Sequence, residues 1–353
     1  MSTTLDSTPL SRNLVSITPK SSSDETFTVL CYNILCEQYA FPTLYPYTPP
    51  NVLAWKYRRQ RILGEIAHRR CDFVCLQEVD WAAFENFFVP ELGREGYEGV
   101  YCPAWAKRLG SESIRPTDGC AVLFRTDRYR LLEKNIIEYT DLAKRLEDFQ
   151  SLKHVGDRLL SRANIAILCL LESLDTGKHI LLVNTHIFWD PNFKDVKIVQ
   201  VGLLTEEIEK MRNMGSSSTP VVLCGDFNSL PDSGVYEFLS SGSLSGQHPD
   251  FMNYSYGRFT REGMKHGLCL SSAYSIAQSD DTPKELLPWT NYTGHFKGVL
   301  DYIWYSSGDL KVNTILGEVD GDYIEKEKVI GFPDAHFPSD HIAIMAEFSI
   351  RSA

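Results

Sequence analysis

Short apolar runs separated by amphipathic segments extend along most of the chain. The runs are continuous or nearly so, as expected for strands that are buried on both faces. We predict strands at residues 27–33, 73–76, 119–124, 165–171, 180–183, 220–224, 299–305 and 342–350. Residues 175–178 (Asp-Thr-Gly-Lys) predict a hairpin turn between two of these strands.

Three segments carry apolar residues at helical spacing. In Trp55 to Ile66, Trp81 to Leu92 and Val196 to Met211 these residues recur three or four positions apart, which predicts amphipathic helices. Strands and helices are mixed without strict alternation, so the pattern favours an α/β fold with packed sheets between outer helices. Residues 140–162 are charged and give no assignment, and residues 241–298 are predicted to be rich in loops.

The sequence predicts an N-terminal tail followed by one domain. Residues 1–25 are rich in Ser and Thr and hold few bulky apolar residues, which predicts a disordered tail. Neither a linker nor a repeat interrupts the remainder, so we expect one domain at residues 26–351. No apolar run reaches the roughly 18 residues of a membrane span, and no membrane association is predicted.

Charge and cysteine content narrow the class of protein. The net charge of −11 and pI near 5.3 argue against a protein that coats nucleic acid through a broad basic surface. They do not exclude a nuclease, because a metal-binding carboxylate cluster is itself negative. The nine cysteines are scattered without zinc spacing, which predicts reduced thiols in a reducing compartment. We expect a cytoplasmic protein, with a nuclear or mitochondrial pool left open.

Polar side chains stand at the ends of the apolar runs. Four runs end at Asn33, at Glu78, at His186 and at the Gly225-Asp-Phe-Asn228 segment. A charged group at the end of a buried strand is costly unless it is paired or binds a metal. Similar positions occur at Asp301 and in Ser339-Asp-His341, and we expect all of these side chains to converge at one rim of the sheets.

The residue types at this rim suit phosphate chemistry with a divalent cation. Glu78 and Asp226 are oxygen ligands of the kind that Mg²⁺ prefers. Asn228 would share a face with Asp226 if the chain stays extended, and Gly225 would allow a close backbone approach. His341 beside a carboxylate could stabilise charge on a transferring phosphoryl group. Each motif alone is also compatible with a strand end or turn, but their joint occurrence favours a site.

Several motifs together resemble the exonuclease/endonuclease/phosphatase superfamily over residues 27–350. They are Tyr32-Asn33, Leu76-Gln-Glu-Val79, Asn184-Thr-His186, Gly225-Asp-Phe-Asn-Ser229, Leu300-Asp-Tyr-Ile303 and Ser339-Asp-His341. Others are similar to the deadenylase branch, which includes nocturnin, the angel proteins and the carbon-catabolite-repressor catalytic subunit. These are Trp55-Lys-Tyr-Arg-Arg59, Asp118-Gly-Cys120, His186-Ile-Phe-Trp-Asp-Pro191 and Gly298-Val-Leu-Asp-Tyr302.

The resemblance implies a deoxyribonuclease I-like four-layer sandwich, with two mixed β-sheets flanked by helices. It also implies two Mg²⁺ ions, which Mn²⁺ could replace. The implied metal site consists of Glu78, Asn33, Asp226, Asn228 and Asp340. The implied catalytic residues are Asp226, which would activate water, His341 paired with Asp301, and His186, which would contact the phosphate.

The resemblance further implies the substrate. Pro191 and Phe296 would hold an adenine between them, and Asn291, Asn228 and His186 would contact the same nucleotide. The expected reaction is Mg²⁺-dependent 3′–5′ hydrolysis of the 3′ end of single-stranded RNA, ideally poly(A), to release 5′-AMP. A phosphatase or phosphodiesterase of small adenine nucleotides, such as NADP or a cyclic or 2′–5′ phosphate, is the alternative. A non-catalytic RNA-binding module is a third, disfavoured by retention of every expected polar residue.

Two further expectations concern partners. No leucine-rich repeats precede residue 27, so we expect a stand-alone monomer without the region that docks into the large deadenylase complex. Basic residues of the segment from Lys56 to Arg70 could form a solvated helix face or a phosphate-binding surface. The remaining candidates for contact with RNA phosphates are Lys107, Arg108, Arg115, Arg158 and Arg162.

Overall fold

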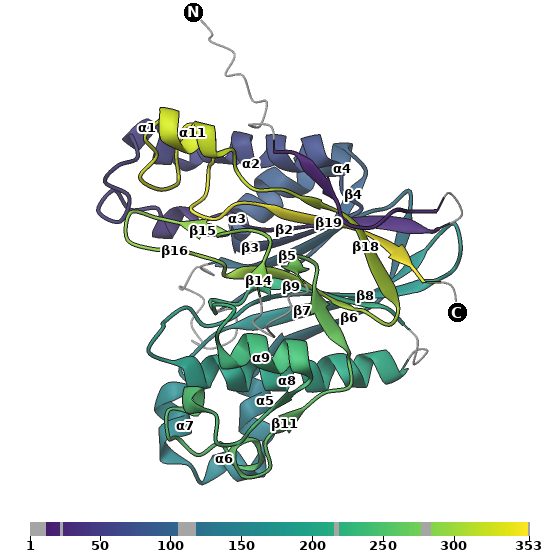
Figure 1. Cartoon of the computed structure of the whole chain (residues 1–353), viewed down its shortest axis with the longest axis vertical. Coiled ribbons are helices and arrows are strands. Elements are labelled where there is room, and N and C mark those ends of the chain that lie inside the picture. The colour runs from purple at the N-terminus through teal and green to yellow at the C-terminus, as the bar shows by residue number, and fades with distance from the viewer. Residues whose placement is uncertain (1–11, 22–23, 105–117, 215–218, 277–283, 352–353) are drawn as a thin grey trace, which may run out of the picture.

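The computed structural model describes residues 12–21, 24–104, 118–214, 219–276 and 284–351. Two mixed β-sheets lie face to face, and helices cover the outer face of each sheet (Figure 1). This arrangement confirms the four-layer α/β sandwich that the sequence predicts.

The first sheet has seven strands in the order β1-β18-β19-β2-β3-β5-β4. Its β2–β3 pair is parallel and its other pairs are antiparallel. The strands are β1 (Leu14–Ser16), β2 (Thr26–Asn33), β3 (Phe73–Asp80), β4 (Tyr97–Pro103), β5 (Asp118–Arg125), β18 (Leu310–Leu316) and β19 (Ile344–Ile350). On its outer face lie α1 (Pro50–Leu53), α2 (Trp55–Arg69), α3 (Trp81–Ala83), a π-helical turn (Phe84–Phe88), α4 (Val89–Arg94) and α11 (Gly321–Lys326).

The second sheet has six strands in the order β12-β17-β9-β8-β7-β6, of which β8 and β9 are parallel. They are β6 (Tyr129–Glu138), β7 (Ile165–Ser173), β8 (His179–His186), β9 (Val221–Asp226), β12 (Leu270–Ser272) and β17 (Asp301–Ser306). The helices of this half are α5 (Tyr139–Arg145), α6 (Glu147–Gln150), α7 (Lys153–Arg158), α8 (Lys194–Met214), α9 (Gly234–Ser241) and α10 (Arg258–Arg261). The charged segment 140–162 is therefore a series of short helices.

Short elements fill the segment that the sequence predicts to be loop-rich. They are β10 (Ser243–Leu244), β11 (Met264–Lys265), β13 (Ser275–Ile276), β14 (Lys284–Glu285), β15 (Asn291–Tyr292), β16 (Lys297–Gly298) and a 3-10 turn at Pro249–Phe251. A second 3-10 turn lies at Glu37–Tyr39.

Three apolar layers hold the sandwich together. Phe27, Phe73 and Val222 belong to the layer between the sheets, where all three are almost completely buried. Two further layers lie between each sheet and its helices, with Ile62 of α2 on one side and Leu204 of α8 on the other. Central strands are thus buried on both faces, which explains their continuous apolar runs.

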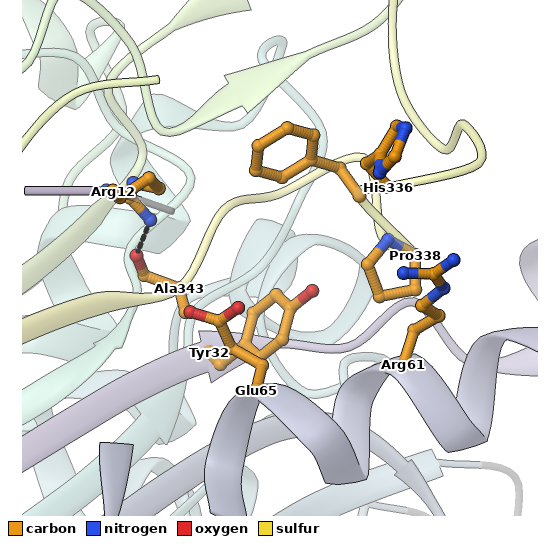
Figure 2. A pocket seen from close by; sticks show the side chains of 8 residues that line it. Arg12, Tyr32, Arg61, Glu65, His336, Pro338 and Ala343 are labelled. Carbon is orange, nitrogen blue, oxygen red and sulfur yellow. Dashed lines mark hydrogen bonds between the residues drawn. The ribbon is translucent and has the colours of Figure 1, made fainter. Parts of the chain in front are cut away.

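The N-terminal segment differs from its prediction. Residues 14–16 form β1 and pair antiparallel with β18, from Leu14 opposite Leu316 to Ser16 opposite Thr314. The Arg12 guanidinium is buried and donates to the carbonyl oxygens of Gly317 and Ala343. Figure 2 shows the contact with Ala343. The predicted disordered tail is therefore wrong for residues 12–21, because carbonyls far along the chain hold this segment; residues 1–11 lie outside the described residues.

Within the described part of the chain, each helix is too short or too polar to cross a bilayer. This includes the longest helix, α8.

Candidate active site

Three neighbouring strands of the second sheet bring acidic and histidine side chains to one rim. Asp226 is the last residue of β9 and lies opposite His186 of the parallel strand β8. On its other side it lies opposite Asp301, the first residue of the antiparallel strand β17. The register therefore places the three side chains together, as the polar ends of the apolar runs predict.

Close packing of β8 and β9 requires a glycine before Asp226. A Cβ atom at Gly225 would lie 2.2 Å from the backbone oxygen of Thr185. Backbone cannot move away from such a contact at low cost, so the close approach predicted for Gly225 is confirmed.

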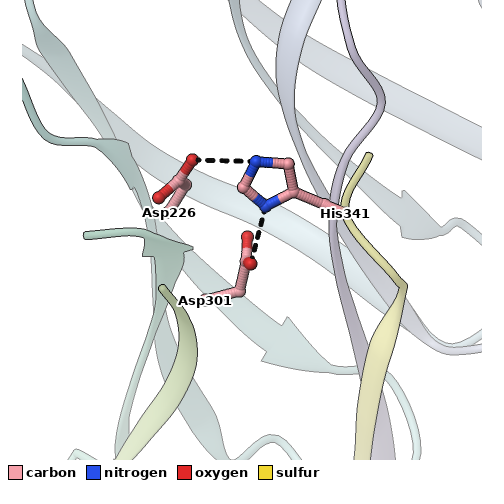
Figure 3. A group of neighbouring side chains, drawn as sticks. All are labelled: Asp226, Asp301 and His341. Atoms are coloured by element: carbon pink, nitrogen blue, oxygen red, sulfur yellow. Dashed lines mark hydrogen bonds and ion pairs between the residues drawn. The ribbon is translucent and has the colours of Figure 1, made fainter. Parts of the chain in front are cut away.

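His341 lies between the two carboxylates. Its Nδ1 is 2.7 Å from Asp301 Oδ2, and its Nε2 is 3.6 Å from Asp226 Oδ2 (Figure 3). Burial lowers the pKa of His341, but Asp301 and Asp226 outweigh burial and raise this pKa well above its ordinary value. The raised pKa favours the imidazolium, in which both nitrogens are donors, while burial also raises the pKa of Asp301. Thr290 Oγ1 also donates to Asp301 Oδ2, at 2.6 Å, and fixes that carboxylate.

Glu78 reaches the same rim from the first sheet. The register of β3 shifts between Leu76 and Val79, and Glu78 has a positive φ of 56°, which turns its side chain out of the regular alternation. Its carboxylate accepts from Asn33 Nδ2 at 2.9 Å and from Cys36 N at 3.0 Å. Burial raises the pKa of Glu78 to about 7. An oxygen ligand that burial makes costly to ionise is a group that a bound cation would stabilise.

Asn33 connects the two halves of the rim. Besides Glu78, its Nδ2 donates to Asp226 Oδ2 at 3.0 Å, while its Oδ1 accepts from Leu35 N at 3.1 Å. In this geometry Asn33 orients two carboxylates that come from different sheets. Behind it, Gln77 Nε2 donates to Asn184 Oδ1 at 2.7 Å, which adds a second polar link between the sheets.

Asn228 is placed by a turn and not by an extended chain. Its φ of 48° is left-handed, and its backbone N–H donates to Asp226 Oδ1 at 2.9 Å. Its side-chain Nδ2 donates to Ile187 O at 3.0 Å and lies 3.2 Å from His186 Nε2. The extended geometry considered from the sequence is therefore wrong, although Asn228 still lies at the site.

Asp340 is held by two residues. Tyr45 Oη donates to Asp340 Oδ2 at 3.0 Å, and Asn291 Nδ2 donates to the same oxygen at 3.2 Å. Asn291 also forms a backbone bridge with His341. The role of Tyr45 has no signal in the sequence, because the residue belongs to an irregular loop rich in proline.

Arg58 is a second residue that the sequence does not identify. It is completely buried, and its guanidinium donates to backbone oxygens of Leu53, Leu35 and Pro338 at 2.8, 2.8 and 3.2 Å. Burial lowers its pKa. Arg58 therefore ties the last residue of α1 to two loops, which corrects the expectation that it belongs to a solvated face or a phosphate-binding surface.

The candidate residues surround two adjoining cavities. The first has a volume of about 730 Å³. It is lined by Glu78, His186, Asp226, Asn228, Asn291, Asp340 and His341. The second, of about 350 Å³, is lined by Pro191, Phe296, Trp189 and Lys197 among others. Asn228 and Trp189 line both cavities, so the implied adenine clamp opens beside the polar rim. Asn33 and Asp301 lie behind the rim and act on its members.

The donor set fits a hard divalent cation. Carboxylates of Glu78, Asp226 and Asp340 line one cavity together with the amide of Asn228, and oxygen ligands are those that Mg²⁺ and Mn²⁺ prefer. Asp226, Asp301 and His341 also lie within 4.8 Å of one another. However, Nδ1 of His341 faces Asp301 at 2.7 Å, so we assign His341 and its partner Asp301 to the phosphate, while Asp226 stays with the metal ligands.

Comparison with known proteins agrees with this site. Residues 30–341 match the Endonuclease/Exonuclease/phosphatase family, and the chain belongs to that family. It is 42% identical over 354 residues to the CCR4-Not complex 3′-5′-exoribonuclease subunit Ccr4 of Schizosaccharomyces pombe, covering 94% of this chain and 50% of the relative. The equivalent subunit of Mycosarcoma maydis is 39% identical over 352 residues, covering 94% and 51%. The chain thus spans about half the length of the curated relatives it matches.

Solved structures show the same fold over nearly the whole chain. A structure of ANGEL2, a 2′,3′-cyclic phosphatase, in complex with adenosine-2′,3′-vanadate has a TM-score of 0.77 and 28% identity, covering 97% of this chain and 99% of that one. The human nocturnin catalytic domain with bound sulfate has a TM-score of 0.66 and 24% identity, covering 96% and 98%. The predicted superfamily is confirmed, and these relatives support its deadenylase branch.

Proposed function

We propose that this protein is a Mg²⁺-dependent 3′–5′ exoribonuclease of the deadenylase type, which hydrolyses the 3′-terminal phosphodiester of RNA and releases 5′-AMP. The observation that carries this proposal is the convergence of Glu78, Asp226, Asp340 and His341 on one cavity that opens beside the Pro191 and Phe296 cavity. Likeness to Ccr4 exoribonuclease subunits supports it.

Each residue has a role that its contacts support. Asp226, oriented by Asn33 and by the Asn228 backbone, accepts a proton from the attacking water. His341, kept protonated by Asp301, donates to the phosphoryl oxygen on which charge develops, and His186 contacts the phosphate from the other side. Glu78, Asp226, Asp340 and Asn228 would hold two Mg²⁺ ions, or Mn²⁺ in their place, with Asn33 as an orienting group. Bound cations would supply charge that stabilises the attacking and leaving oxygens of an in-line displacement.

A second function shares the same machinery. ANGEL2 is a 2′,3′-cyclic phosphatase, and its structure holds an adenosine vanadate, which favours a small adenine nucleotide as the substrate. NADP and 2′–5′ phosphates belong to the same alternative. A non-catalytic RNA-binding role is disfavoured, because the polar rim retains the full set of ligand and acid–base groups.

Product analysis in Mg²⁺ separates these functions. Purified protein is offered poly(A), other homopolymers, NADP and adenosine 2′,3′-cyclic phosphate, and products are resolved by chromatography. Release of 5′-AMP with shortened poly(A) is the expected result. Release of inorganic phosphate from NADP, or of adenosine monophosphate from the cyclic substrate alone, would support the alternative and contradict the exoribonuclease.

The proposed setting is the cytoplasm, and the proposed catalytic unit is a monomer. All nine cysteines are free and only Cys269 is exposed, which suits a reducing compartment. Light scattering of the purified chain tests the monomer, and a mass of twice 40.1 kDa would contradict it.

A further inference from the structure

Two residues outside the catalytic rim are placed to bind a nucleic acid strand. We infer that Trp189 and Arg162 form a second nucleotide subsite, which binds the penultimate nucleotide of the RNA through its base and through the phosphate on its 5′ side. This inference rests on the proposed exoribonuclease activity. It requires that the substrate of this activity extends beyond one nucleotide.

Trp189 is a large aromatic side chain that the fold leaves uncovered. It is 66% exposed, whereas the preceding Phe188 is 8% exposed. Its backbone is nevertheless held firmly, because Lys197 Nζ donates to Trp189 O at 3.4 Å and to Asn228 O at 2.6 Å. An exposed indole on a held backbone at the wall of a cavity is suited to stack on a base.

The position of Trp189 decides which base it meets. The residue lines both the 730 Å³ catalytic cavity and the 350 Å³ cavity of Pro191 and Phe296. If the terminal nucleoside occupies the smaller cavity and its phosphate lies at Asp226, the rest of the strand must leave through the larger one. The nucleotide next to the scissile phosphate then passes Trp189.

Arg162 supplies a cation along this exit path. Its guanidinium lies 4.5 Å from the centroid of the Phe188 ring and 4.6 Å from that of Phe193, and its Nε donates to Arg158 O at 3.0 Å. No carboxylate of the described residues forms an ion pair with it, so its terminal N–H groups remain for an anion. A guanidinium held against aromatic rings presents its edge donors in a fixed direction, which suits a phosphate.

The neighbouring Arg158 differs from Arg162 because it is already paired with a carboxylate. Arg158 also stacks on Phe193, but it makes a double contact with Asp195, with Nε and one terminal nitrogen each 2.7 Å from a carboxylate oxygen. Its charge is therefore neutralised inside the protein. Of the five basic residues considered from the sequence, Lys107, Arg108 and Arg115 lie outside the described residues, which leaves Arg162 as the described candidate.

The charge of the catalytic cavity makes such a cation necessary. Among the described residues that line this cavity, Arg162 is the only arginine or lysine, whereas five carboxylates line the same cavity. These belong to Glu78, Asp118, Asp190, Asp226 and Asp340. A phosphate that no metal ion contacts would be repelled along this path unless Arg162 received it. The carboxylate of Asp190 is partly occupied, since its Oδ1 accepts from the backbone and side chain of Asn192 at 2.9 and 3.0 Å.

Three substrates of increasing length test the subsite. Adenosine 5′-(4-nitrophenyl phosphate) has no penultimate nucleoside, ApA adds that nucleoside, and ApApA adds the phosphate on its 5′ side together with one further adenosine. All three release 5′-AMP, so kcat/KM is compared within one product assay in Mg²⁺. Wild-type protein is expected to prefer ApApA over ApA by about tenfold. The nitrophenyl ester has an intrinsically better leaving group, so the ratio of kcat/KM for ApA to that for the ester is compared between the wild type and the variants.

The variants separate the two contacts. Arg162→Gln is expected to abolish the preference for ApApA over ApA, and Arg162→Lys to restore part of it. Trp189→Ala is expected to lower the ratio of kcat/KM for ApA to that for the nitrophenyl ester by about tenfold, and Trp189→Phe to retain most of the wild-type ratio. Arg130→Gln is the matched control, because Arg130 is exposed on β6 and paired with Glu172; it should change neither ratio.

Each outcome is decisive. Ratios in Arg162→Gln and Trp189→Ala that equal those of the wild type overturn the subsite, as does a wild type without a preference for ApApA over ApA. A wild type that releases no 5′-AMP from any of the three substrates overturns the proposed function, and the subsite with it. Far-ultraviolet circular dichroism and melting temperatures identify a variant that has failed to fold, and Arg162→Lys and Trp189→Phe then provide the decision.

Discussion

Asn33 and Asp226 lie on different sheets, and the Asn33 amide donates to the Asp226 carboxylate at 3.0 Å across the sandwich. The same amide nitrogen donates to Glu78 at 2.9 Å. One neutral donor thus separates two carboxylates that would otherwise repel each other. The geometry of the metal site therefore depends on how the two sheets are packed, and not on a single loop.

Replacement of this donor by a third carboxylate should destabilise the protein. Asn33→Asp removes both hydrogen bonds and adds a negative charge, so we expect a loss of about 2–4 kcal/mol in the free energy of unfolding in EDTA. Mg²⁺ should recover part of this loss, because a cation binds the folded state. Denaturant unfolding with and without Mg²⁺ measures both values. Asn135→Asp, on the edge strand β6, serves as the control, and equal stability of the two variants would contradict the bridging role.

Asp301 is expected to act through the charge state of His341. Asp301→Asn preserves the size of the side chain but removes the carboxylate 2.7 Å from His341 Nδ1, so the imidazolium is no longer stabilised. We expect kcat on oligo(A) to fall by about 10²- to 10³-fold, with little change in KM. Steady-state kinetics at saturating Mg²⁺ measures this effect. A decrease of less than threefold would show that the pair has no part in the reaction.

The sequence predicts the strands that carry the site residues better than it predicts the neighbouring strands and the polar residues that hold the site in place. β3, β8 and β9 are recognisable because each is an apolar run that ends in a polar residue, and burial on both faces imposes that pattern. By contrast, β6 and β18 are missed. The register of each shifts once, between Leu131 and Glu133 in β6 and between Val312 and Thr314 in β18, which breaks the alternation on which a prediction depends.

The supporting polar residues are missed for a different reason. Arg12, Tyr45 and Arg58 bind groups that lie far away in the sequence, and two of the three act on backbone carbonyls. A carbonyl oxygen is present at every residue, so the sequence contains no sign of which ones are unpaired and need a donor. Tertiary structure alone identifies these contacts.

Arg12 should contribute to stability out of proportion to its position near the N-terminus. Its guanidinium is buried against the carbonyls of Gly317 and Ala343, and Ala343 lies two residues after His341. Arg12→Ala leaves these oxygens without a donor, so we expect a loss of about 2–4 kcal/mol. Arg130→Ala removes an exposed arginine and should cost less than about 1 kcal/mol. Urea unfolding of both variants makes the comparison, and a similar small loss in both would contradict the anchoring role.

His266 should make stability depend on pH. Its Nδ1 accepts from Leu268 N at 3.3 Å and its Nε2 contacts Phe238 O at 3.0 Å, an arrangement that requires the neutral ring. Burial lowers its pKa below the ordinary value. The folded state therefore binds a proton less readily than the unfolded state, so this stabilisation is complete above about pH 6.5 and is lost as pH falls through the lowered pKa.

The test of this pH dependence is a pair of variants. We expect the stability of His266→Gln to fall less between pH 7 and pH 5 than that of the wild type, because the titrating group is absent. His68→Gln, on the exposed side of α2, should follow the wild type. Denaturant midpoints at both pH values provide the measurement, and parallel curves for all three proteins would exclude His266 as the source.

Mg²⁺-dependent turnover by Glu78→Gln is the most direct test of the site as a whole. Glu78 accepts hydrogen bonds from Asn33 and Cys36 and lines the catalytic cavity, so Glu78→Gln removes a ligand charge and one of two acceptors while the size of the side chain is kept. We predict that release of 5′-AMP from oligo(A) falls by at least about 10³-fold. Glu98→Gln, which alters an exposed carboxylate on β4, should retain full activity. Turnover of folded Glu78→Gln at the wild-type rate would show that divalent cations are not held at this rim.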